Sequence, residues 1–221
     1  MIANLTYEII IFFCGNYENI RRDLLMDEDR KKTHDFWNDS NIKIYNNAMQ
    51  LLIDRITELD GEYHNKTGRH FIRIIEKRLK TPESIEQKLI YKGKEKSEEP
   101  VENLLNDLAG VRIVCFDTSQ IYKIISMIKK EDKFEIIKEK DYISKPKTNG
   151  YQSYHLILKI ENVKVELQIR TILMDAWSSL ETILVYKKSN PISEELKKEI
   201  HQFDKWSKKM DKLVQKMVKQ R

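Results

Sequence analysis

The stretch KVELQIR, Lys164–Arg170, decides the fold, because apolar and polar residues alternate along it without a break. The apolar positions are Val165, Leu167 and Ile169, and the polar positions that alternate with them are Glu166, Gln168 and Arg170. A period of two predicts a β-strand with one packed face and one free face. The free face carries a carboxylate, an amide and a guanidinium in a row. Such a face either supports a charged substrate or a metal ion, or is an exposed strand face with one cross-strand ion pair.

The length and the composition indicate either a single globular domain or a single domain with a helical extension. The chain has 221 residues, of which 40% are hydrophobic and 34% are charged, so it can bury a sizeable core and is not disordered. The net charge of +5 at pH 7 favours anionic small molecules or nucleic acid as partners without requiring either.

Cysteine usage and hydropathy predict a cytoplasmic protein. The two cysteines are Cys14 and Cys115, and Cys115 lies in an apolar run that predicts a buried thiol rather than a disulfide framework. The apolar run Ile9–Phe13 is too short to span a membrane, and it lacks the basic segment and the cleavage site of a signal peptide. We therefore expect no membrane partner.

Two helices are predicted before the first basic segment. Apolar residues recur three and four positions apart from Asp35 to Leu59, and Gly61 marks the predicted end of this helix. A second helix is predicted over Gly68–Leu79, with these residues on its apolar side: Phe71, Ile74, Ile75 and Leu79.

The next segment is typical of a helix start, since Thr81 can cap the first turn and Pro82 suits the first helical position. The residues that could meet phosphate lie around that start: Arg78, Lys80, Ser84, Lys88 and Lys92. They predict either a polyphosphate cradle or a basic solvated helix face. The chain has only six glycines and no glycine-rich phosphate loop, so a P-loop or a Rossmann dinucleotide site is not expected.

A buried strand over Val111–Phe116 is predicted to follow a tight turn at Ala109–Gly110. Asp107, just before that turn, is either a metal ligand or a cap of the turn. Arg112 lies inside the apolar strand, where it needs a partner or a cleft, because burying an unpaired charge is costly.

The following segment is predicted to add a crossover helix and two strands, over Thr118–Ile128, Phe134–Lys138 and Tyr154–Ile160. The loop before the last strand is rich in Lys, Pro, Asn and Gly. Tyr151 in this loop either stacks on a base or packs against its own loop. His155 lies on the strand face opposite Tyr154, and a lone histidine is more often a structural hydrogen-bonding group than a catalytic one.

Two helices are predicted at the C-terminal end. The helix over Thr171–Lys188 is expected to pack on the sheet through Ile172, Ala176, Leu180, Ile183 and Leu184. The tail after Pro191–Ser193 has a heptad-like seam, broken at Ser207, that consists of Leu196, Ile200, Phe203, Met210, Val214 and Met217. This tail is either a core helix of the monomer or an oligomer contact, and we expect the oligomer contact because the helix is long and terminal.

Four stretches, taken together and in this order, resemble the synthetase domain of the RelA/SpoT family: RLKTPESIEQKL, NDLAGVRIVCF, DYISKPKTNGYQSYHLIL and VELQIRTILMDAWSSLE. The likeness covers roughly Tyr45 to Lys188, and the short chain is similar to the small alarmone synthetases. The resemblance implies an α/β (α+β) fold, a nucleotidyltransferase-like mixed sheet of about five strands flanked by helices. It divides the chain into an N-terminal extension (1–34), a synthetase domain (35–190) and a C-terminal helix (191–221).

The resemblance also implies an activity: a GTP pyrophosphokinase that uses Mg²⁺ and transfers the β,γ-pyrophosphate of ATP to the ribose 3′-hydroxyl of GTP or GDP. Asp107 and Glu166 would be the catalytic residues and the metal ligands, and Glu166 would also help to deprotonate the 3′-hydroxyl. The ATP-binding residues would be Arg78, Lys80, Ser84, Lys88 and Arg112. The acceptor nucleotide would meet Lys147, Asn149, Tyr151, His155, Gln168 and Arg170. A homo-oligomer is expected, and the resemblance favours a tetramer.

The sequence departs from the family pattern at two places. Gln152 stands where the family often has Arg, and Thr182 follows Glu181 where the family often has His, so one cationic and one imidazole contact are missing. The pair His34-Asp35 stands without the upstream metal ligands of a hydrolase, so no degrading activity is expected. Two alternatives stay open: a toxin-like relative that modifies an adenosine nucleotide or the 3′ end of tRNA, and a non-catalytic regulator that binds nucleotide or RNA.

Overall fold

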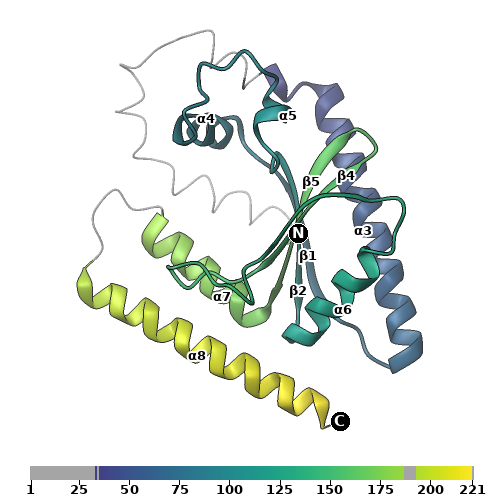
Figure 1. Cartoon of the computed structure of the whole chain (residues 1–221), viewed down its shortest axis with the longest axis vertical. Coiled ribbons are helices and arrows are strands. Elements are labelled where there is room, and N and C mark those ends of the chain that lie inside the picture. Colours follow the sequence, from purple (N-terminus) through teal and green to yellow (C-terminus); the bar gives the residue numbers. More distant parts are fainter. Residues whose placement is uncertain (1–32, 34, 187–192, 221) are drawn as a thin grey trace, which may run out of the picture.

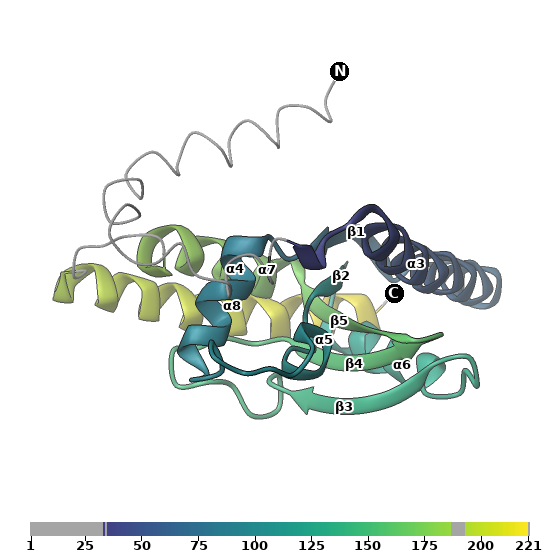
Figure 2. The ribbon, with the colours of Figure 1, turned by 90° about the horizontal axis from the view of Figure 1, so that it is seen from above.

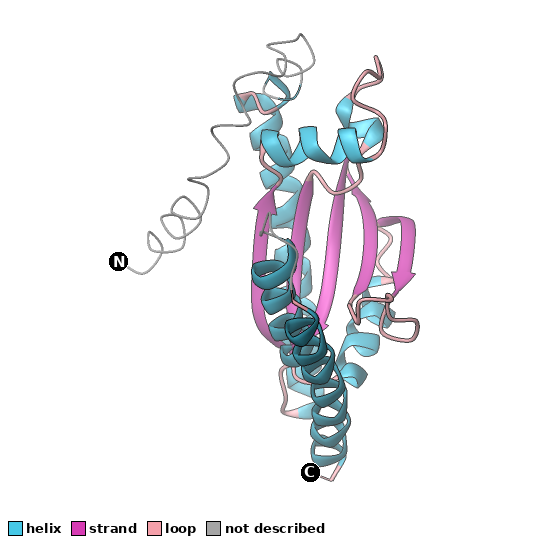
Figure 3. Ribbon diagram, turned by 90° about the vertical axis from the view of Figure 1, so that its left-hand side faces the viewer, coloured by secondary structure: helices cyan, strands magenta, loops and turns pink. Residues whose placement is uncertain are grey.

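A mixed five-stranded sheet with helices on both faces forms the centre of the computed structural model, which describes residues 33, 35–186 and 193–220 (Figure 1). The strands are β1 (Ile72–Leu79), β2 (Ala109–Cys115), β3 (Glu135–Asp141), β4 (Tyr154–Ile160) and β5 (Val163–Thr171). They lie in the order β1-β2-β5-β4-β3. Figure 3 shows the sheet face-on. β2 and β5 run parallel, whereas the other neighbouring strands run antiparallel. The expected mixed α/β (α+β) sheet is confirmed.

The stretch KVELQIR lies within β5, in the middle of this sheet, and the strand that its alternation predicted is confirmed. Its apolar residues Val165, Leu167 and Ile169 are fully buried in the core. The adjacent antiparallel strand β4 has the same bounds as the predicted strand, and the helix α6 (Thr118–Ile128) likewise matches its prediction. These segments were predictable because each carries one unbroken apolar pattern.

Each face of the sheet is covered by its own helices. α3 (Asp39–Thr67) and α6 lie on one side, while α4 (Pro82–Tyr91) and α7 (Ile172–Glu181) lie on the other (Figures 1 and 2). The short helix α5 (Val101–Leu104) precedes β2, and α8 (Glu194–Lys219) packs on α7 and also contacts α6. The sheet face under α3 and α6 packs into the apolar core. The polar side chains of the strands therefore lie on the side of α4 and α7.

Two predictions in the first third of the chain are wrong. α3 continues through Gly61 and ends at Gly68, whose left-handed φ of 70° suits a helix C-cap. The segment predicted as the helix Gly68–Leu79 contains the edge strand β1 instead, which pairs with β2 from Ile72 to Leu79. Isoleucines at three- and four-residue spacing fit a helix locally, but pairing with a strand more than thirty positions later decides the structure.

Two other boundaries also differ from expectation. Ala109 and Gly110 belong to β2 and form no separate turn before it. The strand expected over Phe134–Lys138 begins one residue later, as β3, and continues to Asp141. In both cases the pairing with a neighbouring strand extends the element beyond its apolar run.

The face of α7 that packs inward is not the predicted one. Thr171 caps this helix by accepting a hydrogen bond from the Met174 N–H, which fixes the rotation of the helix. Met174 and Trp177 are buried as a result. Of the expected contact residues, Ala176 and Leu184 are half-buried, whereas Ile172, Leu180 and Ile183 are exposed. The helix continues as the π-helix η1 (Thr182–Tyr186).

The residues of α8 that are buried against the rest of the domain are polar, which was not expected. Asp204, Ser207 and Asp211 are buried, while its large exposed residues are Trp206, Met210, Leu213 and Met217. Cys115 is a buried free thiol, as predicted, and burial raises its pKa. Ile9–Phe13, Cys14, His34 and the extension 1–34, except Thr33, lie outside the described residues. None of the described helices is long and apolar enough to cross a membrane.

Candidate active site

Polar side chains from four neighbouring strands gather on one face of the sheet because the register places them side by side. Across the parallel ladder, Gly110 pairs with Glu166 and Arg112 with Gln168. From the other neighbouring strand, His155 also pairs with Gln168. We call this set the polar face, and it consists of Glu76, Arg112, His155, Glu166, Gln168 and Arg170. The alternation that buries one side of β5 thus presents its carboxylate, amide and guanidinium together on the other side.

Glu166 is held at the centre of the polar face by two neighbours. One oxygen, Oε1, lies 3.1 Å from His155 Nδ1, and Oε2 accepts a hydrogen bond of 2.7 Å from Gln168 Nε2. Burial alone would raise the pKa of this carboxyl, but the hydrogen bonds from His155 and Gln168 and the charges of His155 and Lys88 lower it to about 2. Glu166 is therefore ionised at neutral pH and is a weak proton acceptor.

Asp107 lies just before β2, where two lysines meet it. The Nζ of Lys80 lies 3.1 Å from Oδ2, and the Nζ of Lys88 forms a close ion pair with the same oxygen. The Lys80 backbone is fixed in turn, because its carbonyl accepts a 2.7 Å hydrogen bond from Trp37 Nε1. The charge of Lys88 also lowers the pKa of Glu166, so this lysine acts on both acids. The other oxygen of Asp107, Oδ1, is buried without a hydrogen-bond partner.

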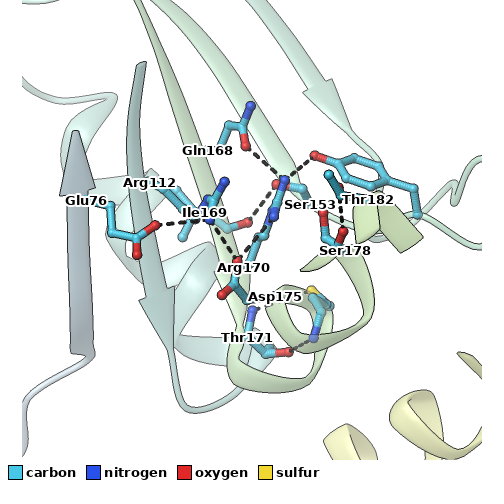
Figure 4. A network of polar contacts seen from close by, with 12 residues as sticks. Glu76, Arg112, Ser153, Gln168, Ile169, Arg170, Thr171, Asp175, Ser178 and Thr182 are labelled. Carbon is cyan, nitrogen blue, oxygen red and sulfur yellow. Dashed lines mark hydrogen bonds and ion pairs between the residues drawn. The ribbon is translucent and has the colours of Figure 1, made fainter. Parts of the chain in front are cut away.

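Two arginines share one carboxylate at the end of the polar face nearest α7 (Figure 4). Arg170 NH1 lies 3.2 Å and Arg112 NH1 3.4 Å from Asp175 Oδ1. Arg112 also pairs with Glu76 at 3.0 Å. Burial and the nearby charge of Arg170 lower the pKa of Arg112, which Asp175 and Glu76 partly offset. This end of the face is therefore a rigid network of alternating charges.

The loop before β4 joins this network through Tyr151. The Tyr151 hydroxyl lies 2.8 Å from His155 Nε2 and accepts a 2.7 Å hydrogen bond from Arg170 NH2. Arg170 NH2 also donates to Gln168 Oε1 at 2.9 Å. Lys147 Nζ lies 4.7 Å from the centre of the Tyr151 ring, a cation–π distance. Asn149 donates a 3.2 Å hydrogen bond to Glu181 of α7.

The structure brings most of the predicted site residues together. Tyr151, His155, Glu166, Gln168 and Arg170 form one hydrogen-bonded chain. Lys80, Lys88 and Asp107 form a second cluster, which Lys88 links to Glu166 by charge. Two predicted residues lie apart from these clusters. Arg78 is exposed on β1 opposite Gly110, and the hydrogen bonds of Ser84 with Thr81 are those of a helix cap.

The sequence analysis missed three acids that hold the arginines and the loop: Glu76, Asp175 and Glu181. Glu76 was hidden because its strand was predicted as a helix. Asp175 lies in the first turn of α7, where an acid also simply favours the helix dipole, so only the fold reveals its two arginine partners. Glu181 was noted only as part of a departure from the family pattern.

Asp107 and Glu166 fit a Mg²⁺ ion that is held by two protein carboxylates. Among the residues described, no group of three or more His, Cys, Asp or Glu side chains could hold a metal ion. The fit rests on two observations: Asp107 Oδ1 is a buried acceptor without a partner, and Glu166 is ionised. Mg²⁺ typically takes one or two protein carboxylates and completes its shell with substrate phosphates and water, so two acids suffice.

The sequence of this chain is similar to that of a known family and of two named relatives. Residues 77–191 match the family profile described as a region found in RelA/SpoT proteins. The chain is 36% identical over 181 residues to the GTP pyrophosphokinase YwaC of Bacillus subtilis, which covers 78% of this chain and 86% of that protein. It is 32% identical over 115 residues to the GTP pyrophosphokinase YjbM of the same organism, which covers 48% of this chain and 54% of YjbM.

Solved structures agree with these relatives. The small alarmone synthetase 2 of Bacillus subtilis superimposes with a TM-score of 0.73 at 34% identity, and the match covers 82% of this chain and 98% of that one. The small alarmone synthetase 1 of Bacillus subtilis, solved with its product pppGpp, superimposes with a TM-score of 0.72 at 27% identity, over 80% of this chain and 93% of that one.

Proposed function

The chain belongs to the RelA/SpoT family, and from that membership we propose that it is a GTP pyrophosphokinase. It transfers the β,γ-pyrophosphate of ATP to the ribose 3′-hydroxyl of GTP or GDP and releases AMP. The observation that carries this assignment is the meeting of two acids, three lysines and two arginines on and around one sheet face: Asp107, Glu166, Lys80, Lys88, Lys147, Arg112 and Arg170.

The charges suit a reaction between two polyphosphates, which repel each other unless cations lie between them. Lys80 and Lys88 lie beside Asp107, and Arg112 lies on β2, the strand that begins two residues after Asp107. In this assignment they bind ATP together with Arg78 and the start of α4 at Ser84, and Arg78 and Arg112 lie against the adenine ring. Planar guanidinium groups suit that contact, because they stack on bases with little loss of freedom.

The acceptor nucleotide is assigned to the other half of the polar face. Tyr151 offers a ring for stacking on guanine, and its hydroxyl is held by His155 and Arg170. Lys147, Asn149 and Gln168 lie around that ring and line the same half. Because each of these groups is already fixed by a neighbour, little ordering accompanies acceptor binding.

Asp107 and Glu166 would hold a Mg²⁺ ion, which neutralises phosphate charge and acidifies a hydroxyl bound nearby. The pKa of about 2 makes Glu166 a better anionic ligand than a proton acceptor. Lys88 now compensates the charge of Asp107, so we expect this lysine to turn toward ATP phosphate when substrate and metal bind.

The assembly and location follow from the same assignment. The exposed apolar residues Trp206, Met210, Leu213 and Met217 of α8 support a homo-oligomer, and the family resemblance favours a tetramer. We assign the protein to the cytoplasm.

One assay tests the assignment. Purified protein incubated with labelled ATP, Mg²⁺ and, in parallel, GTP, GDP, ATP alone or tRNA should label the guanosine nucleotides at the 3′ position. Labelled adenosine nucleotide or tRNA without labelled guanosine nucleotide would instead support the toxin-like alternative. Nucleotide binding without any labelled product, in wild type as in Glu166→Gln, would support a non-catalytic regulator.

A further inference from the structure

The loop that carries Tyr151 lies directly against a buried carboxylate of the C-terminal helix. Gly150 has a φ of +92°, and a Cβ added there would lie 2.9 Å from Asp204 Cγ and 3.2 Å from each carboxylate oxygen. A side chain at position 150 would require the Asp204 carboxylate, the loop or the helix to shift. The backbone of the loop and the Asp204 carboxylate are therefore in contact, although they are 54 positions apart in the sequence.

Asp204 is an unusual residue for the inner face of a helix. It is only 5% exposed, and its charge is paired with Lys208 one turn later, at 2.6 Å. A small cavity beside it is lined by Gly150 and Gln152 of the loop, Trp177 of α7 and Ser207 of α8. Burying a carboxylate between α8 and α7 has a desolvation cost that an apolar side chain would not have. Packing of the two helices alone therefore does not explain the charge at this contact.

The loop is a tight turn that its own hydrogen bonds hold together. The Gly150 N–H donates to Lys147 O at 2.9 Å, and the Lys147 N–H donates to Tyr151 O at 3.1 Å. The Tyr151 N–H donates to Asn149 Oδ1 at 3.2 Å, and the Asn149 amide reaches Glu181 of α7. A shift of Gly150 is therefore transmitted to the next residue, Tyr151, whose hydroxyl must meet His155 and Arg170.

We propose that Asp204 is a positioning residue for acceptor binding, and that α8 sets the affinity for the guanosine nucleotide through its contact with Gly150. This inference rests on the proposed function, because it takes Tyr151 as the ring that meets the acceptor base. Asp204 touches no substrate in this proposal. It holds the turn 147–151 in the position in which the Tyr151 hydroxyl meets His155 and Arg170.

The test separates acceptor binding from donor binding in the full-length protein. In Asp204→Ala we expect the KM for GTP to rise about tenfold while the KM for ATP changes less than about twofold. Gly150→Ala should have the same selective effect, since the added Cβ meets the carboxylate. In the double variant Gly150→Ala/Asp204→Ala the added Cβ no longer meets a carboxylate, and only the backbone strain of an alanine at a φ of +92° remains. The increase in KM for GTP should therefore be smaller than the product of the two single effects.

Glu194→Ala is the matched control. Glu194 is also an acid of α8 paired with a lysine, Lys197, but its side chain is 79% exposed, so both KM values should stay at the wild-type level. Circular dichroism and thermal melting verify that each variant is folded. If Asp204→Ala does not fold, Asp204→Asn, which keeps the shape and loses the charge, should show the same selective change to a smaller extent.

Two outcomes would overturn the inference: an unchanged KM for GTP in a folded Asp204→Ala variant, or equal rises for GTP and ATP, which indicate a general structural role. Calorimetric titration with GDP and with a non-hydrolysable ATP analogue distinguishes this failure from failure of the proposed function. A wild type that makes no product but binds GDP argues against the enzyme, while the ratio of GDP affinities between wild type and variant still tests the positioning role. A wild type that binds no guanosine nucleotide refutes both.

Discussion

Arg112 of β2 and Arg170 of β5 contact the same oxygen atom, Asp175 Oδ1, at 3.4 and 3.2 Å. The two cations repel each other, and that repulsion contributes to the lowered pKa of Arg112. Asp175 therefore holds in one place two guanidinium groups that we assign to different substrates.

Asp175→Asn tests this bridge. Loss of the negative charge should release both arginines, so we expect kcat/KM to fall about tenfold or more with ATP as well as with GTP as the varied substrate. Asp204→Ala serves as the comparison, because in that variant only the KM for GTP should change. A selective effect of Asp175→Asn on one substrate would contradict a shared role.

Glu166→Gln should abolish synthesis, by about a thousandfold or more, and leave the fold intact, because the amide cannot supply a negative charge to a cation. The pKa of about 2 lies below the ordinary value of 4.5, so this carboxylate stabilises the folded state above pH 4.5 and loses that effect as the pH falls toward 2. The wild-type pH–rate profile should accordingly show no step from Glu166 between pH 5 and pH 9. Retained activity in Glu166→Gln would remove the proposed reaction centre.

Lys88→Gln should weaken the binding of a non-hydrolysable ATP analogue by about tenfold, because a charge that offsets phosphate is lost next to Asp107. The same change removes a positive charge that acts on Glu166, so the pKa of Glu166 should rise. Lys123→Gln serves as the control, since this exposed lysine belongs to α6 on the other side of the sheet. Calorimetry at low and at high salt should show a smaller difference between Lys88→Gln and wild type at high salt.

Asp211→Asn should stabilise the protein at alkaline pH. Burial raises the pKa of Asp211 to about 6, with a further contribution from the charge of Asp117, against the opposing hydrogen bond from Thr171. The folded-state pKa exceeds the ordinary value of 3.8, so the ionised form destabilises the folded protein above pH 6 and has no effect below pH 3.8.

We expect Asp211→Asn to be about 2 kcal/mol more stable than wild type at pH 8, and the difference to vanish near pH 4. Chemical denaturation at several pH values measures it. The exposed residue Asp132 supplies the control, because Asp132→Asn should show no such pH-dependent gain. A constant difference at all pH values would mean that charge is not the cause.

The parts of the fold that were predictable are those whose signal is local. β4, β5 and α6 carry unbroken patterns, and the start of α4 carries a Thr-Pro cap that the structure bears out. β1 was misassigned because its isoleucines also fit a helix, and the strand β2 that pairs with it comes later in the chain. A long-range pairing of this kind leaves no mark within a short window of sequence.

The candidate site shows the same limit. The alternation of KVELQIR predicted that Glu166, Gln168 and Arg170 share one face, and they do. That Asp175 holds two arginines, and that Asp204 abuts Gly150, could not be predicted, because each contact depends on the angle at which a helix crosses the sheet or the loop. The heptad pattern of the tail predicted one apolar seam, but the structure half-buries Leu196, Ile200, Phe203 and Val214 and leaves Met210 and Met217 exposed. The fully buried residues of this helix are instead polar.

The residues assigned to the two substrates are separated along the sequence as well as on the two sides of the parallel pair β2 and β5. Every residue assigned to the donor precedes Ile113, and every residue assigned to the acceptor follows Pro146. Substitutions of Asn149 or Tyr151 could therefore redirect the enzyme to a different acceptor while the ATP-binding residues stay unchanged, as long as Asp175 continues to hold Arg112.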